Sequence, residues 1–172
     1  MSAQRRTVLP ALLLALALAT GCAHAPPAAT SVALLQPLRG LYTAGQPAAS
    51  DWQAIKARGV RTVVNLRPPG ELKDRDEAAE VRAAGLHYIE IPVSGAEGIN
   101  PANARALHAA LAPAHGGGVL VHCASGNRAG ALLALEQHEF DGVAAARALE
   151  IGKSAGVTGL EGKVRQALGI VE

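Results

Sequence analysis

Short apolar blocks alternate with longer amphipathic blocks along most of the chain. Four blocks rich in Val, Ile and Leu predict strands over residues 41–44, 60–66, 86–91 and 119–122. Blocks with helical spacing predict helices over 51–59, 74–84, 100–112, 129–138, 143–150 and 158–168. Strands and helices that alternate in this way indicate a three-layer α/β domain with a mainly parallel central sheet and flanking helices.

Capping residues place the starts of three of these helices. Ser50 with Gln53 fits a capping box before the first helix, and Asp74 with Glu77 fits one before the second. Asn100 stands before a proline, which favours a helix start at that point. The loops that follow the predicted strands, at 67–70, 92–99 and 123–128, share the carboxyl edge of the sheet, where ligands bind in such folds.

The first 21 residues have the pattern of an export signal. Arg5 and Arg6 precede the apolar run VLPALLLALALA, which is too short to span a bilayer as a mature helix. The run ends in ATGC, which resembles the lipobox of bacterial lipoproteins and implies lipidation of Cys22. Cleavage after Ala25, giving a soluble periplasmic protein, is the alternative. We therefore expect a signal peptide over 1–21, a lipidated cysteine and tether over 22–36, and one domain over 37–172 of an exported, membrane-anchored protein facing the periplasm.

The charge balance argues against nucleic acid as a partner. The formal charge of +2 comes from Arg5 and Arg6. The rest of the chain has 14 basic residues against 14 acidic residues, so its net charge is zero. A domain with no net charge has no electrostatic reason to bind a polyanion. Aromatic residues make up only 2% of the chain, which leaves few surfaces for stacking bases.

The segment 119–130, VLVHCASGNRAG, holds the residues with the clearest chemistry. If Cys22 carries lipid, Cys123 is the single thiol and no internal disulfide can form. A strand-to-helix turn with a permissive Gly126 can direct amide groups and a helix N-terminus at an anion. Arg128 adds a planar fork that binds two oxygens at once. The same positive field favours the thiolate form of Cys123, which is the nucleophile.

Four blocks in this order, LYTAGQP, GVRTVVNLRPPGE, AGLHYIEIPV and VLVHCASGNRAG, resemble the dual-specificity-type cysteine phosphatases, specifically the bacterial beta-lactamase-hydrolase-like group. The resemblance covers about residues 38–135 and implies that Cys123 attacks phosphorus to form a thiophosphoryl intermediate, which water then hydrolyses. It also implies a phosphorylated protein or small molecule as substrate and no cofactor. The phosphate-binding loop would consist of Ala124, Ser125, Gly126, Asn127 and Arg128.

The general acid is less evident, because the loop over 92–100 lacks the aspartate that classical relatives carry there. Glu97 is the only acid in that loop and is our first choice. The acidic reserve candidates lie in the loop after residue 66, and two basic groups could assist at the mouth or tune the thiol. These accessory residues are Glu71, Asp74, Asp76, Arg67 and His122.

Two departures from the classical pattern keep other functions open. Four residues rather than five separate Cys123 from Arg128, and Ala129 stands where a hydroxyl residue is common. A catalytically weak, anion-binding envelope lipoprotein is one alternative, and a rhodanese-like sulfurtransferase is another. No metal site is expected, since His138, Glu139 and the nearby Asp141 lack the spacing of known metal motifs.

Overall fold

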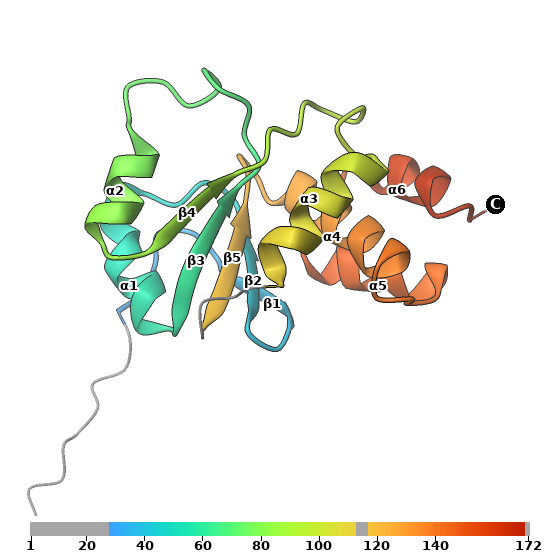
Figure 1. Ribbon diagram of the computed structural model, residues 1–172, viewed down its shortest axis with the longest axis horizontal. Helices are drawn as coiled ribbons and strands as arrows, with labels where there is room; N and C mark the ends of the chain where they lie inside the picture. The colour runs from blue at the N-terminus through green and yellow to red at the C-terminus, as the bar shows by residue number, and fades with distance from the viewer. Residues whose placement is uncertain (1–27, 113–116, 171–172) are drawn as a thin grey trace, which may run out of the picture.

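The computed structural model describes residues 28–112 and 117–170 of the 172-residue chain. A five-stranded sheet lies at its centre, with the strand order β1-β2-β5-β3-β4 (Figure 1). The strands are β1 (Leu35–Leu38), β2 (Leu41–Ala44), β3 (Val60–Asn65), β4 (His87–Glu90) and β5 (Gly118–His122). β2, β5, β3 and β4 run parallel, and β1 pairs with β2 in the antiparallel direction. The predicted mainly parallel sheet is confirmed.

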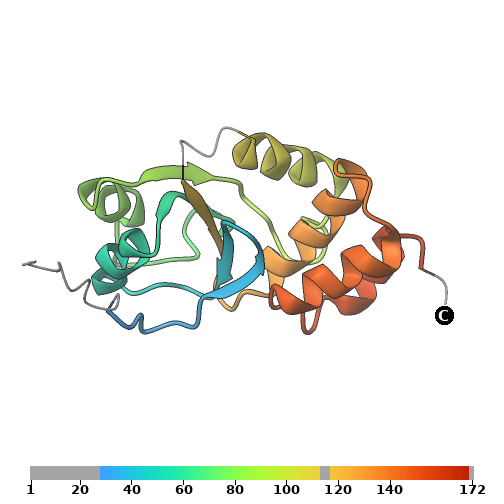
Figure 2. The ribbon, with the colours of Figure 1, turned by 90° about the horizontal axis from the view of Figure 1, so that it is seen from below.

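Helices cover both faces of this sheet. α1 (Trp52–Ala57) and α2 (Glu77–Ala83) pack on one face, where a short 3-10 turn, η1 (Ala49–Asp51), leads into α1 (Figures 1 and 2). The other face is covered by α3 (Pro101–Leu111), α4 (Asn127–Glu139), α5 (Ala145–Ser154) and α6 (Glu161–Ala167). The three-layer architecture predicted from the alternation of elements is therefore confirmed.

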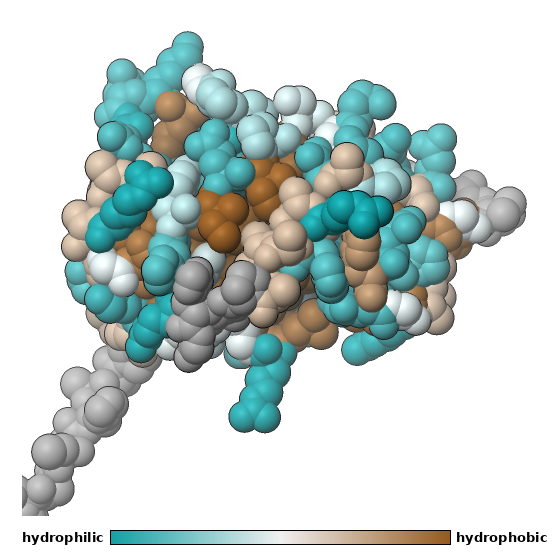
Figure 3. All heavy atoms as spheres, viewed as in Figure 1, coloured by the Kyte–Doolittle hydropathy of each residue, from teal (hydrophilic) through white to brown (hydrophobic). Residues whose placement is uncertain are grey.

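Each face of the sheet has its own hydrophobic core. The smaller core, beneath α1 and α2, contains Trp52, Ile55 and Leu120. The larger core, on the face of α3 to α6, includes Cys123 and most of α4. Hydrophilic residues dominate the face of the molecule in Figure 3, and hydrophobic residues are visible near its centre. β5 is buried on both faces, which is why its sequence is continuously apolar rather than alternating.

Two of the three predicted caps are wrong in detail. α2 begins two residues later than the Asp74 box implies, because Asp76 accepts the hydrogen bond from the Ala79 amide at 3.0 Å. Asp74 lies before the helix with a φ of 62°, a left-handed conformation that Asp tolerates better than most residues. Ser50 lies within η1, and the carboxylate that accepts the Ala48 amide at 2.9 Å belongs to Asp51.

The third cap is confirmed. Asn100 has an extended backbone and accepts a hydrogen bond from the Asn103 amide at 3.0 Å, and Pro101 takes the first helical position. α3 therefore begins where the sequence predicts, because both signals are local to the chain.

The interval assigned to the tether overlaps the folded domain. β1 begins at Leu35, and Ser31 donates hydrogen bonds from its amide and its hydroxyl to Asp51, at 2.9 and 2.6 Å. The boundary at residue 37 is thus too late. Asp51 is 4% exposed, so these bonds satisfy a buried carboxylate that the sequence pattern does not reveal.

The proposed export signal and Cys22 lie outside the described residues. Among residues 28–112 and 117–170, the helices are too short or too polar for a membrane span.

Candidate active site

Cys123 follows β5 at the carboxyl edge of the sheet, and its turn is built as the sequence predicts. The Gly126 amide donates to the Cys123 sulfur at 3.2 Å. Gly126 has a φ of 91° and precedes α4, whose first amides have no carbonyl partner inside the helix. The positive φ favours glycine at this position. Sulfur, bend and helix N-terminus therefore occupy one short segment, which suits the binding of an anion.

Neighbouring loops fix the shape of this turn. The Gln46 amide donates to the Ala124 carbonyl at 3.1 Å, and Gly45 lies so close to the turn that a Cβ atom there would stand 3.1 Å from the same oxygen. Ala124 and Ser125 are exposed, while Gly126 is buried. The turn is thus held from the side of β2 while two of its residues stay open to solvent.

Asn127, predicted to bind phosphate, uses its side chain elsewhere. Its Oδ1 accepts hydrogen bonds from the amides of Thr158 and Leu160, at 2.9 and 3.3 Å. These bonds tie the start of α4 to the segment before α6. The side-chain oxygen is therefore committed to these bonds, and the N–H groups of the side chain and the backbone are the ones that can donate to an anion.

The Arg128 guanidinium forms a two-pronged ion pair with Glu71. Nη1 donates to Oε2 at 2.8 Å, Nη2 donates to Oε1 at 2.5 Å, and Nη1 also donates to the Val93 carbonyl at 3.0 Å. The hydrogen bond to Glu71 raises the pKa of Arg128 most strongly, burial opposes the rise, and interactions with Cys123 add to it. The guanidinium is therefore held by a carboxylate and a backbone carbonyl, and its charge is paired with that of Glu71.

Arg67 holds the same carboxylate from its other side. Its Nε donates to Glu71 Oε1 at 3.1 Å, and its Nη1 donates to the Gln46 side chain at 2.6 Å. The Arg128 hydrogen bond is the largest cause that lowers the pKa of Glu71, and Arg67 lowers it further against a burial effect that raises it. Two of the accessory residues predicted from sequence, Arg67 and Glu71, thus meet Arg128 at one place.

The other acidic candidates take no part in the ion pairs that Arg128, Glu71 and Arg67 form among the described residues. Glu97 is exposed, and in the described part of the chain its carboxylate forms no hydrogen bond or ion pair with Cys123 or Arg128, although its loop supplies the Val93 carbonyl. Asp76 caps α2 and Asp74 is exposed in the loop before it. Of the acids proposed from sequence, Glu71 is the one whose carboxylate reaches Arg128.

His122 points to the opposite face of the sheet from Cys123. Its Nε2 lies 2.8 Å from Oε1 of Glu77, and both side chains are almost fully buried. The geometry does not complete a hydrogen bond between these two atoms. His122 therefore contacts α2 rather than the thiol. Sequence reasoning missed Glu77 except as part of a capping box, because its place at the end of the charged run KDRDE gave no sign that it is buried.

Glu77 belongs to a buried polar network beneath the Arg67 loop. Asn65 donates from Nδ2 to the Tyr88 hydroxyl at 2.8 Å and to Glu77 at 3.4 Å, and its Oδ1 accepts from the Arg67 amide at 2.8 Å. The network thus connects α2, β3 and β4 to the first residue of the loop that carries Glu71. It fixes where that loop leaves the sheet.

One cavity borders the Cys123 turn, and another lies under the neighbouring Arg67 loop. One of about 400 Å³ is bounded by the exposed side of the turn, by Gly45 and Gln46, and by residues 31–35. Another of about 270 Å³ lies under the Arg67 loop and includes Asn65, Glu77 and Tyr88. Neither is lined by Cys123, whose side chain is 1% exposed. The sulfur is therefore closed to solvent in this structure, in which Arg128 is paired with Glu71.

A parallel α/β sheet with a Cys-to-Arg turn at its carboxyl edge defines a phosphatase-like protein of the protein tyrosine and dual-specificity type. Residues 38–139 match the family model of the beta-lactamase hydrolase-like protein, phosphatase-like domain, and the chain belongs to this family. The fold and the family together support phosphoester hydrolysis, so the resemblance inferred from the four sequence blocks is confirmed.

Individual relatives agree with this assignment. A beta-lactamase hydrolase-like protein of Xylella fastidiosa is 36% identical over 140 residues, which is 74% of this chain and 31% of that protein. The chain thus spans less than a third of the length of this curated relative.

Solved structures share the fold. A candidate phosphatase from Shewanella putrefaciens has a TM-score of 0.60 at 26% identity, covering 79% of this chain and 91% of that one. TpbA of Pseudomonas aeruginosa, solved in complex with pTyr, has a TM-score of 0.58 at 24% identity, covering 76% and 78%.

Proposed function

We propose that the protein is a cysteine-dependent phosphomonoesterase in which Cys123 attacks phosphorus and Arg128 binds the phosphoryl oxygens. The observation that supports this most directly is the bidentate contact of the Arg128 guanidinium with a carboxylate, beside the turn in which the Gly126 amide donates to the Cys123 sulfur. A carboxylate and a phosphoryl group present similar pairs of oxygens to a guanidinium. Glu71 therefore occupies the position in which a substrate phosphate would bind.

Substrate binding must displace Glu71 from Arg128. The phosphate dianion then takes the guanidinium and the free amides of the turn, and the Cys123 sulfur attacks phosphorus as the ester oxygen leaves. Water hydrolyses the resulting thiophosphoryl group, which returns the sulfur as thiolate. Glu97 remains our proposed proton donor to the leaving oxygen, because it is the only acid in the loop over 92–100.

Two classes of phosphate ester are candidate substrates for this site. TpbA, which shares the fold, was solved with pTyr, and this supports phosphorylated protein side chains as one candidate class. Small phosphate monoesters offer the same dianion and are the other.

The test is turnover of p-nitrophenyl phosphate by the purified chain and its cysteine variants. We expect Cys123→Ser to lose activity and Cys22→Ser, a matched change outside the domain, to keep it. Arg128→Ala should cost about 10²- to 10³-fold in kcat, the usual effect of removing one donor to a transition-state oxyanion. Activity that survives in Cys123→Ser would remove this cysteine from the mechanism.

A second candidate function is anion binding without turnover. The pairing of Arg128 with Glu71, the 1% exposure of Cys123 and the exposed position of Glu97 favour it. Saturable binding of phosphate or vanadate, with no hydrolysis of aryl phosphates by the unmodified chain, would support this candidate over the phosphatase.

We also propose that Cys22 is lipidated and anchors the domain to the envelope membrane on its periplasmic side. The ATGC sequence after the apolar run supports this proposal. Labelled palmitate should be incorporated into the protein in cells and should be lost in Cys22→Ser, which should move to the soluble periplasmic fraction. Unchanged labelling in that variant would exclude Cys22 as the lipid site.

A further inference from the structure

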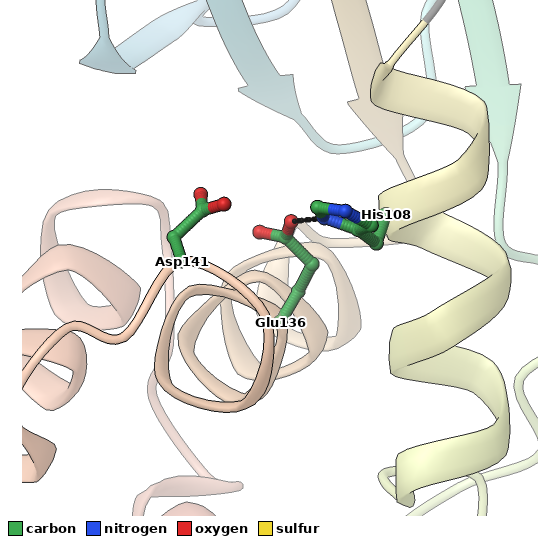
Figure 4. Close-up of side chains that lie close together, drawn as sticks. All are labelled: His108, Glu136 and Asp141. Carbon is green, nitrogen blue, oxygen red and sulfur yellow. Dashed lines mark hydrogen bonds and ion pairs between the residues drawn. The ribbon is translucent and has the colours of Figure 1, made fainter.

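A second cluster of chemically active side chains lies at the far end of α4 from Arg128. His108 projects from α3, Glu136 from α4, and Asp141 from the turn after α4, and all three point into the same space (Figure 4). Their ligating atoms lie within 4.8 Å of one another. Arg128 is eight positions before Glu136, or about 12 Å along the helix axis. The cluster is thus separate from the candidate active site.

Glu136 is the unusual member, because its carboxylate is buried. Its side chain is 1% exposed, and a buried carboxylate needs a compensating charge or hydrogen bonds. His108 Nδ1 lies 2.8 Å from Glu136 Oε1, and the side-chain amide of Gln137 donates from Nε2 to Glu136 Oε2 at 3.0 Å. No Lys or Arg within residues 28–112 and 117–170 forms an ion pair with Glu136.

Asp141 brings a second carboxylate to the same point. The side-chain nitrogen Nε2 of Gln137, which donates to Glu136, also donates to Asp141 Oδ2 at 2.5 Å. The two acids therefore share one neutral donor group. Two carboxylates this close repel each other when both are ionised, and a cation between them relieves the repulsion. A divalent cation is the compensating group that a pair of acids and an imidazole ordinarily bind.

The imidazole is already oriented toward this point. The His108 ring stacks on Phe140 at a centroid distance of 4.9 Å and an interplanar angle of 22°. Stacking fixes the ring with Nδ1 directed at Glu136, and such support of a ligand's orientation is a common property of metal sites. Arg105 lies over the same Phe140 ring and does not pair with the carboxylates.

We propose that His108, Glu136 and Asp141 bind a divalent transition-metal ion, with Zn²⁺ as the best fit to one nitrogen and two carboxylate ligands. Mg²⁺ and Ca²⁺ prefer sites made of oxygen alone, so they should bind poorly. The ion would connect α3, α4 and the turn before α5. Sequence spacing did not indicate the site, because His108 and Glu136 are 28 positions apart.

The test is Zn²⁺ titration of the full chain carrying Cys22→Ser and Cys123→Ser, so that neither thiol competes for the metal. We expect saturable binding of one Zn²⁺ in the micromolar range by calorimetry, no binding of Mg²⁺, and a rise in the thermal midpoint with Zn²⁺. Co²⁺ should give visible absorption bands from the same site. Because both thiols are absent, the result does not depend on the proposed phosphatase mechanism.

Variants in that background identify the ligands. His108→Ala and Asp141→Asn should each weaken Zn²⁺ binding about tenfold or more, the size produced even by outer-shell changes at metal sites. His138→Ala is the matched control, since its imidazole bonds to the Val143 carbonyl instead. Asp141 is exposed, so Asp141→Asn decides the question even if His108→Ala loses its fold. Absence of saturable binding, or equal affinity in all variants, would overturn the proposal.

Discussion

Replacing Glu71 by Gln is the change that best shows whether this carboxylate competes with phosphate for Arg128 or holds Arg128 in place to bind it. The substitution keeps the size of the side chain and removes its charge, so the ion pair with Arg128 is lost while Arg67 keeps its bond to the Glu71 carbonyl at 2.8 Å. If Glu71 occupies the phosphate position, an oxyanion should bind the variant more tightly. If Glu71 instead holds Arg128 in place for the substrate, binding should weaken.

The expected size follows from the exposure of the pair. The side chains of Arg128 and Glu71 are 13% and 33% exposed, so water partly screens their attraction. A pair of this kind is worth about 1 kcal/mol, near the upper end for exposed ion pairs and below the value for buried ones. Because 1.4 kcal/mol is a tenfold change, Glu71→Gln should bind phosphate about fivefold more tightly.

The assay is calorimetric binding of inorganic phosphate in a Cys123→Ser background, where turnover cannot interfere. Glu150→Gln is the control, since it removes one carboxylate from α5, where Glu150 is 59% exposed and pairs with Lys153 at 3.5 Å. Its affinity should match that of the parent. Unchanged or weaker binding by Glu71→Gln would refute the view that this carboxylate competes with phosphate.

Acidification should have the same effect on the unmodified site. The Arg128 hydrogen bond lowers the pKa of Glu71, so the ion pair persists through neutral and mildly acidic pH and is lost as the pH falls through that lowered value. Sulfate remains a dianion in this range. Its affinity should therefore rise as the pH falls below the ordinary glutamate pKa of about 4.3. The rise should be absent in Glu71→Gln, and an equal rise in both proteins would exclude Glu71 as its cause.

Three further changes test other parts of the site. Gly126→Ala places a Cβ on a backbone with a φ of 91°, which should cost about 1–2 kcal/mol in urea unfolding and weaken phosphate binding; unchanged binding would show that the bend is not part of the anion site. Glu77→Ala removes the buried carboxylate beside His122 and one of the two acceptors of the Asn65 side-chain amide, so the free energy of unfolding should fall by about 1–3 kcal/mol, whereas an unchanged value would mean that the network adds no stability. Asn127→Ala removes two bonds to the segment before α6 and should increase amide hydrogen exchange there but not in β5; uniform exchange would contradict this role.

Local sequence signals predicted the scaffold of the candidate site well. The apolar run of β5, the glycine bend and the start of α4 lie within twelve consecutive residues, and each depends on backbone preferences of that segment alone. Asn100 and Pro101 placed the start of α3 for the same reason. The cap of α2 was misplaced because two aspartates two positions apart, Asp74 and Asp76, can each serve, and the left-handed backbone at the first assigns the cap to the second.

Contacts between distant segments decided the rest. Arg128 contacts Glu71, which is 57 positions away in the sequence. His122 contacts Glu77 on the face of the sheet covered by α1 and α2. β1 forms only because β2 offers an edge to pair with. A carboxylate's sequence neighbours do not say which guanidinium it will reach. The sequence by itself determined that a cysteine and an arginine share one turn, because a bend and a helix start are short-range properties of the backbone. Only the tertiary structure decided which acid lies against that arginine, since this depends on how the loop between β3 and α2 folds over the strand ends.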